Sequence, residues 1–314
     1  MQGTVLTIGE IVVEIMATTP GHGFREAIEL LGPFPSGAPA IFIDQMAKLG
    51  VPCAMVGAVG DDDFGRVNID RLRRDGVDVS AIAVHPDATT GSAFVRYRPD
   101  GQRDFVFNIK HSANGRSGLT DAARVAIARA THLHVVGSSF STPAIVETVM
   151  AAMADIKARG GTVSFDPNVR AELFGDPEVS RALAGVMKQT DLFLPSGDEL
   201  YLFADQRDET AAISELLSRG VTAVVLKRGA KGARYVDAAT DISAPAFTVD
   251  EIDPTGAGDI FGATFVAGWL TELPPTETLR RANAAGAIAV GRKGPMEGTS
   301  TSDEIARFLA GRPN

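Results

Sequence analysis

The segment that decides the fold reads Asp253-Pro254-Thr255-Gly256-Ala257-Gly258-Asp259-Ile260-Phe261-Gly262. A strand-like stretch, 247–252, precedes it, and a helical pattern, 260–270, follows it. Two glycines at a strand-to-helix turn let the backbone approach a ligand closely. The N–H groups of the first helical turn point outward, with the positive end of the helix dipole behind them. The sequence therefore predicts an anion-binding turn, and phosphate is the typical ligand of such turns.

Asp259 stands inside this turn, where its charge would repel a bound phosphate. Catalysis gives a reason for it, because a carboxylate there can accept the proton of an attacking hydroxyl. The alternative is that Asp259 only complements the helix dipole. We expect the catalytic role, with Asp259 ionised at neutral pH because the helix N-terminus stabilises its charge.

Other nucleotide and hydrolase motifs are missing from the sequence. It contains no G-x-x-x-x-G-K-[ST], no zinc helix motif and no G-x-S-x-G elbow. The turn is not a dinucleotide-binding G-x-G-x-x-G either, because Phe261 occupies the place of the third glycine. A dehydrogenase is therefore a poor fit.

The composition is that of an ordinary globular protein. Hydrophobic residues make up 45% of the 314 residues and charged residues 22%, with a net charge of −9 spread along the chain. This balance argues against a nucleic-acid partner, which needs a basic face. It leaves room for a small anionic ligand in a locally positive pocket.

Cysteine usage and the first residues indicate the compartment. Cys53 is the single cysteine, so no internal disulfide can form, as expected in a reducing compartment. The first residues lack the pattern of a signal peptide, and no apolar run reaches the ~20 residues that span a bilayer. We therefore expect a cytoplasmic protein without a membrane partner.

The second half of the chain alternates strand and helix patterns. Strands are predicted at 132–137, 162–165, 192–194 and 223–227, and a helix is predicted from Pro143 to Gly160. This rhythm predicts a mostly parallel sheet between two helix layers, with ligands at the carboxyl ends of the strands. We expect one domain over 1–314, of the α/β class.

The first third alternates apolar and polar residues instead. Segments 91–98 and 103–109 flank Pro99-Asp100-Gly101, which predicts a β-hairpin, and 12–16 alternates similarly. Strands at about 11–17 and 91–110 would form a small β-sheet lid over the site.

The turn at 253–259 resembles the second signature of the PfkB, or ribokinase-like, sugar kinases, D-T/P-x-G-A-G-D. Further landmarks follow in family order: Ile8-Gly9-Glu10 to Glu14; Ser36-Gly37-Ala38-Pro39-Ala40; Val59-Gly60-Asp61-Asp62-Asp63-Phe64-Gly65; Phe165-Asp166-Pro167-Asn168-Val169-Arg170; Lys227-Arg228-Gly229-Ala230-Lys231-Gly232; and Asn283 to Gly286. The resemblance covers nearly the whole chain. It implies the ribokinase-like three-layer α/β/α fold and transfer of a phosphoryl group from ATP to a sugar.

The resemblance also implies roles for individual residues. Asp259 would be the base, beside an anion hole of Gly256, Ala257 and Gly258. The expected sugar-binding residues are Glu14, Gly37, Ala38, Phe94, Arg96, Phe107, Arg170 and Asp259. The expected nucleotide-binding residues are Ser196, Lys227, Gly229, Gly232, Gly256, Gly258 and Asn283. Glu199 is expected at Mg²⁺, and a monovalent cation such as K⁺ near Asp253. A homodimer through the lid is a further expectation.

Three departures from the family pattern fall at ligand-binding positions. Ile41 and Ser36 stand where the family usually has a sugar-binding Asn and a Gly. In the element N-x-x-E, which the family links to Mg²⁺ and phosphate through water, Ser196 replaces the Asn and Glu199 is kept. Glu14 stands near the usual sugar-binding Asp. The contacts to the sugar must therefore differ from those of many relatives.

The sugar is inferred from the lid. Ile109 stands where the ketodeoxygluconate kinases carry an arginine for the substrate carboxylate, although Arg96 could substitute for it. We expect a neutral ketohexose, phosphorylated at a primary hydroxyl to the 6-phosphate. Because the stretch 32–45 looks most like bacterial tagatose kinases, tagatose comes first, then fructose, then ketodeoxygluconate. A non-catalytic sugar or nucleotide sensor is the alternative from another class.

Overall fold

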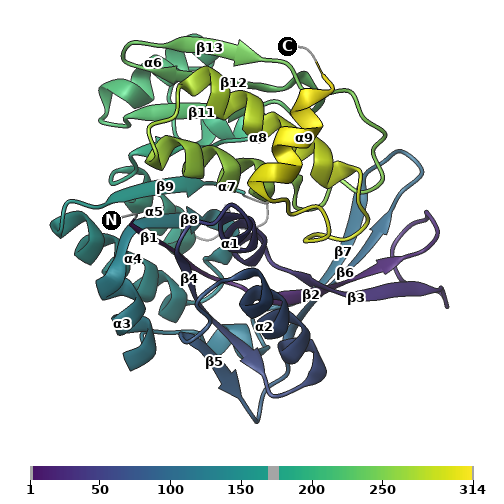
Figure 1. Cartoon of the computed structure of the whole chain (residues 1–314). Helices are drawn as coiled ribbons and strands as arrows, with labels where there is room; N and C mark the ends of the chain where they lie inside the picture. The colour runs from purple at the N-terminus through teal and green to yellow at the C-terminus, as the bar shows by residue number, and fades with distance from the viewer. Residues whose placement is uncertain (1–2, 169–176, 313–314) are drawn as a thin grey trace.

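A computed structural model describes residues 3–168 and 177–312 of the chain. A large sheet runs through the molecule between helices, and a smaller sheet projects from one side (Figure 1). The fold class predicted from the sequence, a three-layer α/β/α arrangement with a small lid sheet, is confirmed.

The large sheet has nine strands in the described part of the chain, in the order β13-β12-β11-β10-β9-β8-β1-β4-β5. The strands up to β11 pair in parallel, and β12 and β13 add antiparallel at one edge. Their bounds are β1 Thr4–Ile8, β4 Cys53–Gly60, β5 Ile82–His85, β8 Ala130–Val136, β9 Thr162–Asp166, β10 Leu192–Phe193, β11 Ala223–Lys227, β12 Ala233–Asp237 and β13 Asp241–Ala244. The central strands are buried because helices cover both faces, and this is why they read as apolar runs.

Two apolar cores lie on the two faces of this sheet. One core contains residues of α1, α7 and α8, and the other residues of α3, α4 and α6. The helices are α1 Ala38–Lys48, α2 Asp63–Asp75, α3 Asp121–Arg129, α4 Pro143–Ala158, α5 Pro177–Met187, α6 Glu209–Ser218, α7 Ala257–Leu270, α8 Pro275–Val290 and α9 Ser302–Ala310. The predicted start of α4 is confirmed, since Thr142 caps it and Pro143 takes its first position.

The smaller sheet, called the lid here, has the strand order β3-β2-β6-β7 within the described residues. Its strands are β2 Val12–Ala17, β3 Leu30–Ser36, β6 Gly91–Tyr97 and β7 Arg103–Asn108. Strands form at the positions where the alternating pattern predicted them. Strand β3 was missed because Pro33 and Pro35 argue against a strand from sequence. It lies at the sheet edge, the place where prolines are tolerated.

The strand expected at 247–252, before the phosphate-binding turn, is wrong. The chain leaves the large sheet after β13, and the Asn283 side chain donates to the carbonyls of Ala244 (3.3 Å) and Pro245 (3.1 Å). At the far end of this segment, the N–H groups of Ile252 and Asp253 both donate to Val290 O. The segment therefore runs along α8 instead of pairing with a strand.

Across residues 3–168 and 177–312, we find no helix with the length and apolar character needed to cross a membrane.

Candidate active site

An ion pair lies at the carboxyl ends of two strands of the large sheet. Asp166 ends β9, Lys227 ends β11, and the Lys227 Nζ bonds to Asp166 Oδ2. Both side chains are buried. Burial lowers the pKa of Lys227, but the charges of Asp166, Glu199 and Asp259 outweigh it, and the net shift is upward. A lysine held charged at this edge is suited to a phosphate ligand.

The phosphate-binding turn faces this lysine. Gly256 caps α7 with φ +79°, and a Cβ there would lie 2.5 Å from Pro295 O, so both conformation and space require glycine. Lys227 Nζ lies 3.9 Å from the position that a Cβ on Gly258 would occupy. The Ala257 N–H donates to Pro254 O at 3.3 Å. The start of α7 therefore lies beside a buried cation.

Asp259 occupies the first turn of α7 and is half-buried. Asn168 Nδ2 lies 3.5 Å from Asp259 Oδ1. Burial and the charge of Asp166 raise the pKa of Asp259 well above its usual range; Lys227 opposes this, and Glu10 adds to it. The sequence predicts that the helix N-terminus favours the charged form of Asp259, but burial and a neighbouring carboxylate act in the other direction. A raised pKa brings a carboxylate closer to the range that suits a general base.

Glu10 was not predicted as a site residue. Its carboxylate is buried and accepts hydrogen bonds from the hydroxyls of Ser138 (2.9 Å) and Ser139 (2.7 Å). A Cβ on Gly37 would lie 2.4 Å from Glu10 O, so Gly37 lets the start of α1 pack against this strand end. Ala38 is the first residue of α1. The signal for Glu10 was its position just after β1, at the ligand-binding edge.

Glu14 is buried in lid strand β2, with Ser36 Oγ 3.5 Å from its Oε2. The two departures at Glu14 and Ser36 thus lie side by side. Ile41, which stands where the family usually has a sugar-binding Asn, is buried in α1. Two of its methyl carbons lie 3.3 Å from the position that a Cβ on Gly256 would occupy. Ile41 therefore packs against the phosphate-binding turn.

The strand register divides the lid side chains between two faces. Glu14 is paired with Ala93, Ala93 with Phe107, and Tyr97 with Arg103, so these side chains share one face. Tyr97 and Arg103 reach the phosphate-binding turn from this face. The face that carries Glu14 and Phe107 is therefore turned toward the candidate site.

Phe94 and Arg96 lie on the opposite face, because they alternate with Ala93 and Tyr97 along β6. Arg96 pairs with Glu26 and donates to the carbonyls of Thr19, Pro20 and Gly23. Phe94 contacts Phe24 edge to face, with 6.2 Å between ring centroids. The geometry corrects the expectation that these two side chains face the sugar, since both hold the 18–29 segment over the back of the lid.

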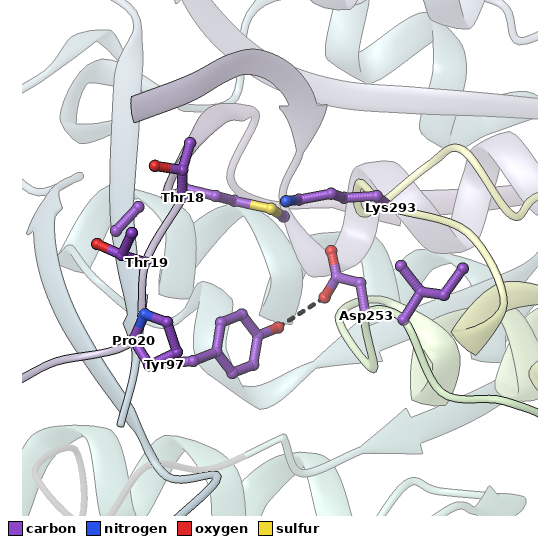
Figure 2. Close-up of a pocket in the computed structure, with 9 residues that line it drawn as sticks. Thr18, Thr19, Pro20, Tyr97, Asp253 and Lys293 are labelled. Carbon is purple, nitrogen blue, oxygen red and sulfur yellow. Dashed lines mark hydrogen bonds between the residues drawn. The ribbon is translucent and has the colours of Figure 1, made fainter. Parts of the chain in front are cut away.

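Tyr97 joins the lid to the phosphate-binding turn, a contact that sequence reasoning missed. Its hydroxyl donates to Asp253 Oδ1 at 2.7 Å and lies 3.3 Å from Thr255 Oγ1. Arg103 Nη1 donates to the same Thr255 oxygen at 3.4 Å. Figure 2 shows the Tyr97–Asp253 bond beside a cavity of about 210 Å³, between the lid and Lys293. The lid is thus closed onto the turn.

Of the predicted nucleotide residues, Ser196 pairs with Lys227, and Gly229 and Gly232 lie in the turn that follows Lys227. Ser196 forms a parallel bridge with Lys227, and Glu199 accepts the Ser196 N–H at 2.7 Å in a capping box. Gly229 begins the 3₁₀ helix Gly229–Lys231, and Gly232 ends it. Asn283, as described above, holds the chain after β13. The structure thus brings Ser196, Glu199 and Lys227 together, while Arg170 lies outside the described residues.

The donor set fits a weakly held Mg²⁺. Within residues 3–168 and 177–312, no group of three or more His, Cys, Asp or Glu side chains could hold a metal ion. Mg²⁺ in kinases keeps several waters and binds mainly to substrate phosphates and one or two carboxylates. Glu199, whose charge acts on Lys227, is in a suitable place for that role.

The sequence profile of the pfkB family carbohydrate kinases matches residues 3–302. The chain is 32% identical to fructokinase-2 of Zea mays over 95% of this chain and 91% of that protein. An E. coli protein provisionally named ribokinase II, solved with ATP and Mg²⁺, shares 44% identity with a TM-score of 0.93, covering 99% of this chain and 100% of that one. A Vibrio cholerae O395 fructokinase double mutant, solved with fructose, ADP and potassium, shares 27% identity with a TM-score of 0.83 over 98% of each chain.

The chain belongs to the pfkB family of carbohydrate kinases. It is a phosphotransferase that acts on a sugar, and the suspected family membership is confirmed.

Proposed function

We propose that this protein is an ATP-dependent ketohexose kinase that forms the 6-phosphate of fructose or tagatose. The observation that carries the proposal is the position of Asp259, in the first turn of α7, beside Asn168 and the Lys227–Asp166 pair. A half-buried carboxylate at a phosphate-binding turn is placed to accept a proton from a hydroxyl aimed at that turn.

In this reaction the primary hydroxyl of the sugar attacks the terminal phosphorus of ATP and its proton passes to Asp259, while the bond to the bridging oxygen breaks and ADP leaves. The amides at Gly256–Gly258 and the Lys227 ammonium would stabilise the charge on the transferring phosphoryl group. Phosphoryl transfer depends on positioning and charge neutralisation, so this small set of groups is sufficient. Mg²⁺, with Glu199 on the protein side, would add positive charge at the nucleotide phosphates.

The side chains of the lid favour a neutral sugar as the substrate. Phe105 and Phe107 stack on the face turned toward the site, with ring centroids 5.0 Å apart. Arg96, the substitute clamp for a carboxylate, is bound to Glu26 on the other face. Arg103 lies on the site face, but it donates to Thr255 and covers the Phe105 ring, with 5.5 Å from its guanidinium carbon to the ring centroid. Fructokinases among the relatives, including one solved with fructose, support the ketohexose class.

A monovalent cation near Asp253 is part of the proposal. The Asp253 carboxylate accepts hydrogen bonds from Tyr97 (2.7 Å), Thr255 N (3.0 Å) and Gly294 N (3.0 Å). Since a carboxylate has about four lone-pair positions, one remains for a cation that backbone carbonyls would also hold. The potassium in the Vibrio fructokinase structure supports this inference.

The decisive experiment is an ADP-release assay with ATP, Mg²⁺ and a sugar panel of fructose, tagatose, ribose and 2-keto-3-deoxygluconate. We expect kcat/KM for a ketohexose to exceed that for the acid sugar by about tenfold or more, because a carboxylate would lose its water while Arg96 and Arg103 are engaged with Glu26 and Thr255. A preference for the acid sugar would instead support the ketodeoxygluconate kinase alternative. Sugar binding without turnover of any sugar would support the sensor.

The homodimer through the lid and the cytoplasmic location remain predictions. Leu30 and Leu31 on β3 and Val106 and Phe107 on β7 are exposed apolar side chains at the two edges of the lid, and exposed apolar residues are suited to a partner surface. Sedimentation of the wild type and of Val106→Asp would test the dimer. If both sediment as monomers, the lid surface has another role.

A further inference from the structure

The loop 291–301 supports the phosphate-binding turn. Gly294 N donates to the Asp253 carboxylate at 3.0 Å, and Pro295 O lies against Gly256. The backbone of the turn therefore takes its position from this loop, which comes about forty residues later in the chain. A group that fixes the loop fixes the turn.

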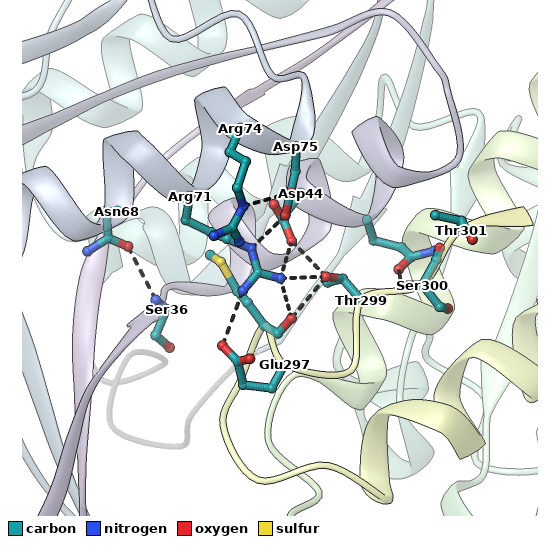
Figure 3. Close-up of polar contacts among 12 residues, drawn as sticks. Ser36, Asp44, Asn68, Arg71, Arg74, Asp75, Glu297, Thr299, Ser300 and Thr301 are labelled. Carbon is teal, nitrogen blue, oxygen red and sulfur yellow. Dashed lines mark hydrogen bonds and ion pairs between the residues drawn. The ribbon is translucent and has the colours of Figure 1, made fainter. Parts of the chain in front are cut away.

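Arg71, on α2, binds this loop through hydrogen bonds (Figure 3). Its Nη2 donates to Met296 O at 2.6 Å and to Thr299 Oγ1 at 2.8 Å. Its Nη1 donates to Glu297 Oε1 at 3.1 Å. One guanidinium thus binds three residues of the loop. Only 9% of the Arg71 side chain is exposed.

Two helices hold Arg71 and the loop together. Asp75 accepts from Arg71 Nε at 2.6 Å on α2. Asp44, on α1, accepts from Arg71 at 3.2 Å and from Thr299 Oγ1 at 2.8 Å. Gln45 adds a two-way pairing with the Ser300 backbone, at 2.9 and 2.8 Å. Charges buried in this way are a poor source of net stability, and they are better explained by the geometry they impose.

We propose that Arg71 is a positioning residue for phosphoryl transfer, which holds the loop 294–300 and through it the phosphate-binding turn. This inference rests on the proposed kinase function. Arg71 acts through Gly294 and Pro295, so its loss would displace the turn relative to Asp259 while the sugar contacts on the lid stay intact. A displacement of the reacting groups by 1 Å can lower a rate about 100-fold.

Arg71→Lys tests the proposal, because lysine keeps the charge but cannot donate to three groups at once. We expect kcat for the preferred ketohexose to fall roughly 10- to 100-fold, with KM for the sugar changed less than about threefold. Arg159→Lys is the matched control. Arg159 donates to Ala130 O (3.0 Å), Ile127 O (2.8 Å) and Asp155 (2.9 Å) at the end of α4, away from the turn. We expect this control to lower the unfolding temperature and leave both kinetic constants unchanged.

Hydrogen exchange gives a second readout that needs no sugar turnover. In Arg71→Lys we expect faster amide exchange across 253–262 than in the wild type, with exchange in β11 unchanged. A folded Arg71→Lys protein with wild-type kcat and wild-type exchange in the turn would overturn the proposal. If the wild type phosphorylates none of the sugars, the proposed function fails, while the exchange comparison still decides the role of Arg71.

Discussion

The hydroxyl of Tyr97, on the lid strand β6, donates a hydrogen bond to the buried carboxylate of Asp253, with 2.7 Å between Oη and Oδ1. This bond connects the lid, which would cover the sugar, to the turn that would bind the phosphoryl group. In the proposed reaction, this bond would couple sugar binding under the lid to placement of the phosphoryl group at the turn.

Tyr97→Phe should weaken lid closure. A hydrogen bond to a charged group contributes about 1.5–3 kcal/mol, and we expect KM for the sugar to rise roughly tenfold. Tyr235→Phe is the matched control, since the Tyr235 hydroxyl also donates to an aspartate, Asp237, on β12 of the large sheet. Steady-state kinetics of both variants make the comparison. Equal KM values in Tyr97→Phe and the wild type would disconnect this bond from sugar binding.

Asp259→Asn should keep the fold and the amide contacts while removing basicity. We expect kcat to fall about 10²–10⁴-fold, with nucleotide affinity nearly unchanged. The turnover number, nucleotide affinity and circular dichroism spectrum are measured on the same preparation. Near-normal turnover in a folded Asp259→Asn protein would remove Asp259 from the mechanism.

Lys227→Met should move the acid limb of the pH–kcat profile to higher pH. The Lys227 charge lowers the pKa of Asp259, which burial and Asp166 raise, so its removal leaves the raising effects unopposed. Turnover requires the deprotonated base and must then be lost at a higher pH. Lys157→Met, which breaks a partly buried pair with Asp191, should leave the profile in place. An unshifted acid limb in Lys227→Met would show that the limb does not report Asp259.

Gly256→Ala should destabilise the turn through a steric contact in addition to backbone strain. A left-handed conformation costs a non-glycine residue roughly 1–2 kcal/mol, and the new methyl would also meet Pro295 O at 2.5 Å. Gly160 has nearly the same φ, +78° against +79°, with nothing within 4 Å of its Cβ position. We expect Gly160→Ala to lower only the free energy of unfolding, and Gly256→Ala to lower kcat as well. Similar kinetics in the two variants would argue against a tightly packed phosphate-binding turn.

Asp44→Asn should change the pH dependence of stability. Burial raises the pKa of Asp44 from 3.8 to about 7; Arg71 opposes this, and Asp75 adds to it. The folded state therefore binds more protons than the unfolded state between about pH 4 and pH 7, so Asp44 makes the wild type less stable as pH rises through this window. The effect is at most about 1.4 kcal/mol per pH unit.

Urea unfolding at pH 5, 6, 7 and 8 measures this difference. The other titrating groups are common to both proteins, so the free energy of unfolding of Asp44→Asn should gain on the wild type as pH rises. A constant difference across the series would mean that Asp44 titrates in its ordinary range.

The local sequence determined the phosphate-binding turn, the βα order and the lid hairpin. These features depend on neighbouring residues: glycines at a turn, Pro143 at a helix start, and alternation along 91–109. Asp259 could be predicted as the base from sequence, because this prediction depends on the glycine-rich turn that contains it. The direction of its pKa shift could not, since this depends on Asp166, Lys227 and burial.

Only the tertiary structure decided which distant residues meet. Asp166 and Lys227 are 61 positions apart, and Arg71 and Met296 are 225 apart. No local pattern encodes such pairs, because they arise from the order of strands in a sheet and the packing of helices on it. The same holds for Arg96. Alternation along β6 places Arg96 on one face of the strand. The contacts of Tyr97 and Arg103 with the turn show that the opposite face is directed toward the candidate site.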